Sequence, residues 1–210
     1  TISRRQRQMC IRDRYSAVAA LHDVGVMHRF INPGSIYINS KGVPKLADMR
    51  YSKVMDGQKS YTICGDPLYF APEVVKQVGY NYSVDLWSLG CTIYELYEGK
   101  HPIGTPEMDE TTLYKTISSF EAGTLEFSKK SSKKVRSVVT ALLTGDSGAR
   151  CGYRDPVEMM SKNLFSKVDW VNLGNDYDAP WDLISHLDGN QVFIESNLEE
   201  CRDNQSFKAF

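Results

Sequence analysis

The chain has 210 residues, of which 41% are hydrophobic, and its 25 basic and 26 acidic side chains give a formal net charge of −1. This length and balance are enough for one sizeable core. No apolar run approaches the roughly 20 residues of a transmembrane helix, and we expect no signal peptide. Five cysteines without C-x-x-C spacing favour reduced thiols over a disulfide frame or zinc site, so we expect a cytoplasmic protein without a membrane partner.

Residues 1–14 differ from the rest of the chain. The stretch 4–13, RRQRQMCIRD, resembles the translation of a widely used sequencing adapter, and we interpret residues 1–14 as adapter-derived. The alternative is a natural basic arm that binds nucleic acid or an acidic surface. The segment holds five arginines and one aspartate, so without it the remaining chain has a net charge of −5. We therefore expect no nucleic-acid partner.

The first predicted elements are a helix and a hairpin. Apolar residues at 15–22 have helical spacing, and Gly25 follows as a stop signal. Residues 36–46 alternate between apolar and polar around Asn-Ser-Lys-Gly at 39–42, which is typical of a β-hairpin.

The middle of the chain predicts a loop and then a buried helix. Residues 49–70 lack periodicity and predict a long loop. The stretch 85–98 is apolar on most sides, as in a central buried helix, and Gly99 follows it. Weaker helical patterns occur further along, at 110–119, 132–143 and 155–162.

Four short motifs follow one another along these elements. They are HRFINPGS at 28–35, DMR at 48–50, APE at 71–73 and DLWSLG at 85–90. Any one of them could arise by chance, but their order and spacing together resemble the large, C-terminal lobe of a protein kinase over residues 15–165. The resemblance implies a mainly α fold with a short β-hairpin pair. It also implies that the small lobe, with its Gly-rich loop and V-A-I-K strand, is missing.

The first motif differs from that family at the positions of the catalytic residues. Active kinases that it resembles read H-R-D-x-K-P-x-N, so the base, the phosphate-contacting lysine and the metal-binding asparagine fall at Phe30, Asn32 and Ser35. Phe30 has no acceptor atom, Asn32 carries no charge, and the Ser35 hydroxyl is a poor ligand for octahedral magnesium. The resemblance therefore implies a pseudokinase with no catalytic residue at the base position.

Cofactor binding is reduced in the same way. Asp48 matches the D-F-G aspartate and is the one residue left at a cofactor-binding and metal-binding position. Arg50 stands where active kinases carry the glycine of that motif, so we expect a locally altered, inactive-like turn. Asp66 replaces a threonine that bonds the base, and Tyr37 crowds the adenine floor. We expect no cofactor in this fragment and only weak ATP and Mg²⁺ binding in the full-length parent.

Regulatory positions of the family are retained in part. Thr62 matches the activation-loop phosphosite, and Arg29 and Lys53 match the cations that hold its phosphate. Glu95 matches an acid that reads a substrate arginine, whereas Gly34 replaces a second such acid. The resemblance therefore implies a groove for basic peptides in weakened form.

Structural positions of the large lobe are also retained. Glu73 and Arg150 match a pair that is buried beneath the substrate platform in the family. Asp85 opens the predicted central helix, and His28 matches a core residue beneath the D-F-G position. Because random decay would not spare Asp48, Glu73, Asp85 and Arg150 so evenly, their retention disfavours a degraded gene product.

The end of the chain indicates which group of kinases the sequence resembles most. Residues 166–210 lose periodicity and end in Phe207-Lys208-Ala209-Phe210, which resembles the C-terminal tail of AGC-group kinases. The alternative is a disordered acidic tail with chance phenylalanines. The stretches TICG at 62–65 and YNYSVD at 80–85 resemble the cyclic-nucleotide-dependent (cAMP or cGMP) members.

Three functions are compatible with these residues. The favoured one is a non-catalytic kinase-like module that binds protein partners or regulates an active kinase. The second is a residual ATP-dependent Ser/Thr kinase with an unusual base, and the third is a degraded gene product. The Lys and Gly-rich loop of the missing lobe would discriminate the first two.

Overall fold

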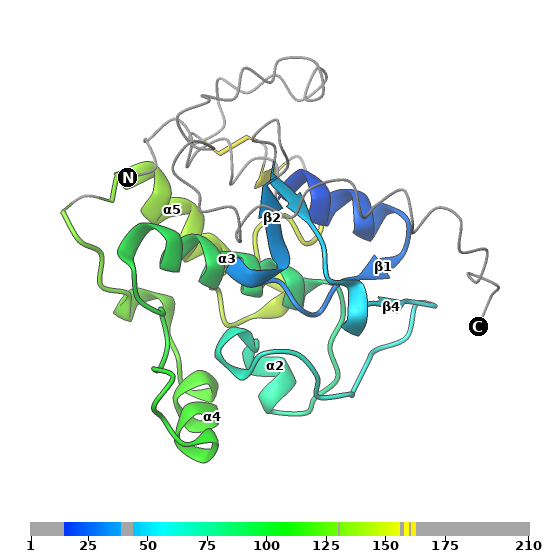
Figure 1. The fold of residues 1–210 in the computed structure, drawn as a ribbon, viewed down its shortest axis with the longest axis horizontal. Coiled ribbons are helices and arrows are strands. Elements are labelled where there is room, and N and C mark those ends of the chain that lie inside the picture. The colour runs from blue at the N-terminus through cyan, green and yellow to red at the C-terminus, as the bar shows by residue number, and fades with distance from the viewer. Residues whose placement is uncertain (1–14, 39–43, 130, 156–157, 160, 163–210) are drawn as a thin grey trace.

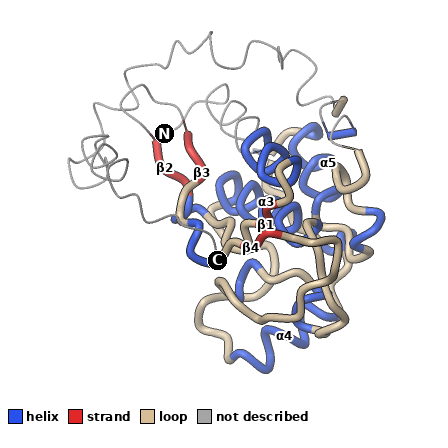
Figure 2. Tube along the Cα trace, turned by 90° about the vertical axis from the view of Figure 1, so that its right-hand side faces the viewer, coloured by secondary structure: helices blue, strands red, loops and turns tan. Residues whose placement is uncertain are grey.

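The computed structural model of the protein describes residues 15–38, 44–129, 131–155, 158–159 and 161–162. Within these ranges the chain is mainly helical, with two small two-stranded antiparallel sheets (Figures 1 and 2). The predicted mainly α fold with short hairpins is confirmed for this part of the chain. Its helices are all too short or too polar to cross a bilayer.

The longer helices lie where the apolar pattern predicts them, whereas the four-residue helix at 72–75 was not predicted. Residues 15–23 are helical, and they are followed by α2 (Pro72–Val75), α3 (Ser83–Glu98), α4 (Glu110–Ser118) and α5 (Lys133–Leu142). Side-chain caps begin two of them: the Asp109 carboxylate accepts from the Thr112 amide, and the Ser132 hydroxyl accepts from the Val135 amide. Gly99 ends α3 with a φ of 70°, a left-handed conformation that glycine adopts without strain. Residues 158–159, inside the last predicted helix, are helical as well.

The strands are short. β2 (Ile36–Ile38) and β3 (Pro44–Leu46) form the predicted hairpin, and its turn lies outside the described residues. A second pair, β1 (Val26–Met27) and β4 (Lys53–Val54), was not predicted. The segment 49–70 is therefore not a plain loop, since it also holds the 3₁₀ turns η2 (Met49–Tyr51) and η3 (Pro67–Tyr69). Elements of two or three residues are too short to leave a periodic pattern.

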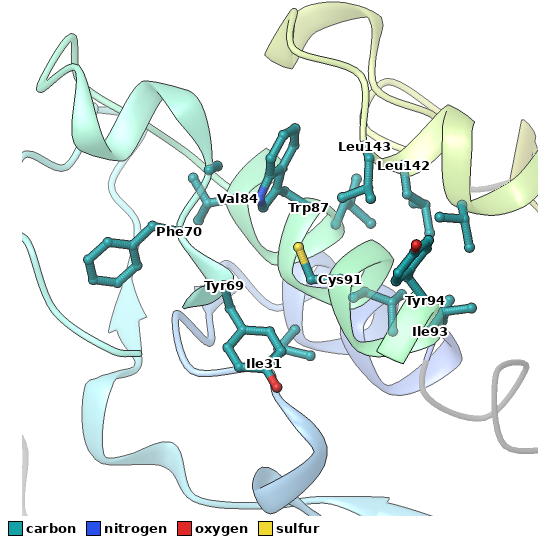
Figure 3. Close-up of a cluster of buried hydrophobic side chains, with 14 of the residues drawn as sticks. Ile31, Tyr69, Phe70, Val84, Trp87, Cys91, Ile93, Tyr94, Leu142 and Leu143 are labelled. Carbon is teal, nitrogen blue, oxygen red and sulfur yellow. The ribbon is translucent and has the colours of Figure 1, made fainter. Parts of the chain in front are cut away.

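Helix α3 forms the centre of the core (Figure 3). Trp87, Cys91 and Ile93 are fully buried on it, and α5 packs against it through Val138, Val139, Leu142 and Leu143. Gly90 permits this close approach, because a Cβ there would lie 2.9 Å from the Leu142 Cβ. The residues before Tyr15 and the kinase-type tail at 166–210 lie outside the described part of the chain.

Candidate functional site

Asp85 fixes the backbone of the kinase-type loop from the first turn of α3. Its two carboxylate oxygens accept hydrogen bonds from the backbone amides of His28 and Arg29, each at 2.8 Å. The His22 ring nitrogen Nε2 lies 2.9 Å from the same carboxylate. Asp85 is fully buried, and these hydrogen bonds compensate for the loss of water around its carboxylate. Arg29 is held at a φ of +63°, a conformation that is uncommon for a residue with a side chain.

The two polar replacements in this loop are bonded to each other. The Ser35 amide donates to Asn32 Oδ1 at 2.9 Å, and the Asn32 amide donates to Ser35 Oγ at 3.1 Å. The Ser35 hydroxyl in turn donates to the Asn32 carbonyl at 2.9 Å. Ser35 is fully buried and Asn32 is 6% exposed. This reciprocal cap of a 3₁₀ turn engages Asn32 Oδ1 and Ser35 Oγ, the two side-chain oxygens that a metal ion would have to contact.

Phe30, at the base position, belongs to an aromatic and cationic contact. The Phe30 ring centroid lies 5.0 Å from the Tyr51 ring centroid, and the Arg50 guanidinium lies 5.7 Å from the Phe30 centroid. The same guanidinium donates from Nε to Asp48 Oδ1 at 2.6 Å. Asp48 raises the pKa of Arg50 through this hydrogen bond and its charge. The Arg50 side chain therefore joins Asp48 to Phe30.

The D-F-G-type turn differs from the expectation in one respect. Arg50 lies in η2 without a positive φ, and the left-handed residue is Asp48, with a φ of 66°. Aspartate tolerates that region better than most residues do. The strain we expected at Arg50 is therefore carried by Asp48, and the inactive-like character of the turn stays a prediction.

These residues do not fit a magnesium ion of the kind that kinases bind. Mg²⁺ requires several oxygen ligands in near-octahedral arrangement. Asp48 already pairs with a guanidinium, and the Ser35 oxygen both donates and accepts within its own turn. Within the described residues, no cluster of three or more histidine, cysteine, aspartate or glutamate side chains could hold a metal.

The predicted phosphosite and its cations lie around one short bridge between Ser60 and Tyr80. Arg29 Nη1 donates to the Tyr80 hydroxyl at 3.3 Å, and that hydroxyl donates to the Thr62 carbonyl. Lys53 Nζ lies 3.4 Å from Ser60 Oγ. Thr62 itself is exposed. The structure therefore brings the three predicted positions to one neighbourhood, and the role of Thr62 as a phosphosite stays a prediction.

The predicted Glu73–Arg150 pair is formed and buried. Arg150 donates from Nη1 to Glu73 Oε1 at 2.7 Å and from Nη2 to Oε2 at 3.1 Å. Its Nη1 also donates to the Ser83 carbonyl, and its Nε donates to the Thr144 carbonyl. The guanidinium lies 5.1 Å from the Trp87 ring centroid. Each nitrogen of Arg150 therefore has a partner, as a buried charge requires.

Glu95, the predicted substrate-groove acid, lies in a second polar cluster. The Tyr69 hydroxyl donates to Glu95 Oε2 at 2.5 Å, and His101 Nε2 lies 3.5 Å from the same oxygen. The Tyr69 and His101 rings meet edge to face at 4.6 Å. Burial and the bond to Glu95 raise the pKa of Tyr69, and burial lowers the pKa of His101. This cluster was not expected, because nothing in the sequence connects Tyr69 to His101.

Three other replaced positions have simple local surroundings. Asp66 caps η3 by accepting a hydrogen bond from the Leu68 amide at 3.1 Å. Tyr37 lies on β2 opposite Lys45 and is 38% exposed. Gly34 is exposed in the first 3₁₀ turn. Asp66 thus caps a 3₁₀ turn, whereas the threonine at this position in the kinases that the chain resembles bonds the base.

Comparison with known proteins supplies the family. The family described as "Protein kinase domain" matches residues 1–165. The chain belongs to the protein kinase family. The chain is 30% identical over 168 residues to the cAMP-dependent protein kinase catalytic subunit 2 of Drosophila melanogaster, covering 79% of the chain and 46% of that protein.

Cyclic-GMP-dependent kinases are similar to this kinase domain as well. Human cGMP-dependent protein kinase 2 is 36% identical over 111 residues, which cover 52% of the chain and 14% of that protein. The cGMP-dependent protein kinase of Plasmodium berghei (strain Anka) is 29% identical over 209 residues, covering 97% of the chain and 24% of that protein. The chain thus spans less than half of each of these curated relatives, all of which carry names of cyclic-nucleotide-dependent kinases.

Three side-chain contacts of the kinase domain were not predicted from the sequence. His22 reaches Asp85 across 63 residues of chain, and Arg50 pairs with Asp48 across a single turn. His101, just after the Gly99 helix stop, reaches back to Glu95. The position of His101 two residues after a helix stop does not by itself indicate a contact with Glu95.

Proposed function

We propose that the chain is the large-lobe part of an AGC-group, cyclic-nucleotide-dependent-type kinase that has lost phosphate transfer and acts as a scaffold or allosteric regulator. The supporting observation is the closed loop at the catalytic positions. The side-chain oxygens of Asn32 and Ser35 accept hydrogen bonds from each other's backbone amides, and Phe30 packs beside Tyr51. A loop that is satisfied internally offers little to a nucleotide or a hydroxyl substrate.

The magnitude of this loss argues against efficient catalysis. A positioned base contributes about 10²–10⁴-fold to a rate, and Phe30 has no atom that could accept a proton. Electrostatic stabilisation of the transferring phosphoryl group is lost as well, because Asn32 is uncharged. We infer that the full-length parent binds ATP weakly at most, since Asp48 alone would have to hold a metal while paired with Arg50.

A residual Ser/Thr kinase is the second candidate. It is favoured by the retained Asp85 anchor, which positions the loop backbone, and by the neighbourhood of Arg29, Lys53 and Thr62. Such an enzyme would need an acceptor other than Phe30 for the substrate proton. Catalysis that depends on Asp48 would favour this candidate over the regulator.

The partners we propose are proteins, either an active kinase or basic peptides that bind at Glu95. The Glu95 side chain is 31% exposed, so a cationic group can reach it. We propose no nucleic-acid or membrane partner and a cytoplasmic location. The proposed boundaries are an adapter-derived segment at 1–14, the kinase lobe at 15–165 and an AGC-type tail at 166–210, and sequencing of the complete transcript tests them.

The regulatory role is tested by adding the full-length parent to an active cyclic-nucleotide-dependent kinase and measuring the KM and kcat for a basic peptide. We expect the parent to bind that kinase and to change one of these constants. The heat-denatured parent is the control and should have no effect. A parent that neither binds the kinase nor alters its kinetics would contradict the regulatory role.

A further inference from the structure

Glu95, Tyr69 and His101 come from three separate parts of the lobe. Glu95 lies in the last turn of α3, Tyr69 ends η3, and His101 follows the left-handed turn at Gly99. The Tyr69 hydroxyl and His101 Nε2 both approach the same carboxylate oxygen, Oε2. The cluster is therefore built around one acid.

The second carboxylate oxygen of Glu95 is not used by these contacts. Both described contacts of the carboxylate are made to Oε2, and the side chain is 31% exposed. The His101 side chain is 7% exposed, and its Nδ1 is buried without a partner in the described residues. The partly exposed Glu95 carboxylate thus lies beside the buried His101 ring, which can be neutral or protonated.

We propose that His101 is an internal competitor for the Glu95 carboxylate. Protonated His101 pairs with Glu95 and weakens binding of guanidinium or ammonium groups from a basic peptide, whereas neutral His101 leaves the acid available. This inference rests on the proposed basic-peptide site at Glu95. It adds a specificity- and pH-determining residue that the sequence motifs do not contain.

The sign of the effect follows from the groups that face His101. Burial opposes its charge and lowers its pKa below the usual value, while the carboxylates of Glu95 and Asp66 work in the opposite direction. The Tyr69 ring contacts it edge-on, and the tyrosine hydroxyl remains protonated because its pKa is raised. His101 is therefore neutral at neutral pH and gains charge on acidification. By linkage, a cation bound at Glu95 disfavours that charge by the same factor.

The test uses the full chain and an amidated, fluorescent arginine-rich peptide without other titrating groups. Affinity is measured at about pH 7.5 and at the lowest pH at which the chain stays folded, because burial places the His101 pKa below the usual histidine value. For the unmodified chain we expect a loss of about fivefold or more at the lower pH, the low end of typical coupling between two sites. His101→Gln, which cannot gain charge, should bind equally at both pH values, and Glu95→Gln should bind poorly at both. Circular dichroism confirms folding at each pH.

A second readout does not depend on peptide binding. The titration of the His101 ring, followed by NMR, should move to lower pH in Glu95→Gln, because Glu95 favours the charged ring. An unchanged titration, or equal pH dependence in the unmodified chain and His101→Gln, would overturn the competition. Absence of peptide binding together with a shifted titration would instead overturn the proposed basic-peptide site and leave the Glu95–His101 coupling standing.

Discussion

Arg50 Nε lies 2.6 Å from Asp48 Oδ1, so the acid that we predict at the metal-binding position is already paired with a cation from its own turn. The Arg50 side chain is 65% exposed and that of Asp48 is 13% exposed. An ion pair with so much solvent contact is weak in itself, and a divalent cation could compete with it. Its effect on a metal is nevertheless direct, because Arg50 adds positive charge where the metal would have to bind.

Removal of Arg50 should therefore make Asp48 more available to divalent cations. We expect Arg50→Gln to increase the affinity for Mn²⁺ several-fold, measured by paramagnetic broadening of NMR signals near residue 48. Arg50→Lys, which keeps the charge, is the matched control and should change affinity little. Equal Mn²⁺ affinity in both variants and the unmodified chain would contradict this role of Arg50.

The Glu73–Arg150 pair predicts a large stability effect. Arg150→Met leaves the Glu73 carboxylate buried and uncompensated, which should cost about 3–5 kcal/mol of unfolding free energy in urea titrations. Lys100→Met, which removes the exposed partner of Glu126, is the control and should cost at most about 1 kcal/mol. Similar losses from the two substitutions would show that the buried pair does not stabilise the lobe.

Gly90 tests the packing of α3 against α5. Alanine at a helix interior normally gains about 1 kcal/mol over glycine. At Gly90 the added Cβ would lie 2.9 Å from atoms of both Leu142 and Leu143, and overpacking of this kind costs about 1–3 kcal/mol. We therefore expect Gly90→Ala to lower the melting temperature, while Gly123→Ala, with no atom within 4 Å of the added Cβ, should not. A more stable Gly90→Ala variant would contradict the packing.

The architecture was predictable from sequence where a helix has a long apolar pattern or where the family resemblance indicates an ion pair. The helix at 83–98 and the Glu73–Arg150 pair are examples, since one has many apolar residues and the other has complementary buried charges. The β1–β4 pair was not predictable, because two-residue strands leave no alternation. Contacts such as Arg50 with Asp48 depend on rotamers and on a left-handed residue at position 48, which residue spacing does not determine.

The buried His28 predicts a dependence of stability on pH. Its Nδ1 accepts a hydrogen bond from the Phe30 amide, and burial lowers its pKa below the usual value. The unfolded chain then binds more protons than the folded one below about pH 6.5, so the unfolding free energy should fall as the pH drops through that value. Denaturant titrations from neutral to acidic pH measure this slope. His28→Gln should make it shallower, and an unchanged slope would assign the effect to other groups.

Phosphate transfer by the full-length parent, measured with radiolabelled ATP and a basic peptide, tests the proposed loss of catalysis most directly. Because Phe30, Asn32 and Ser35 supply neither base nor charge, we predict no incorporation above the enzyme-free blank and no further change on Asp48→Ala. Incorporation that exceeds the blank and disappears on Asp48→Ala would contradict the account and identify a residual kinase.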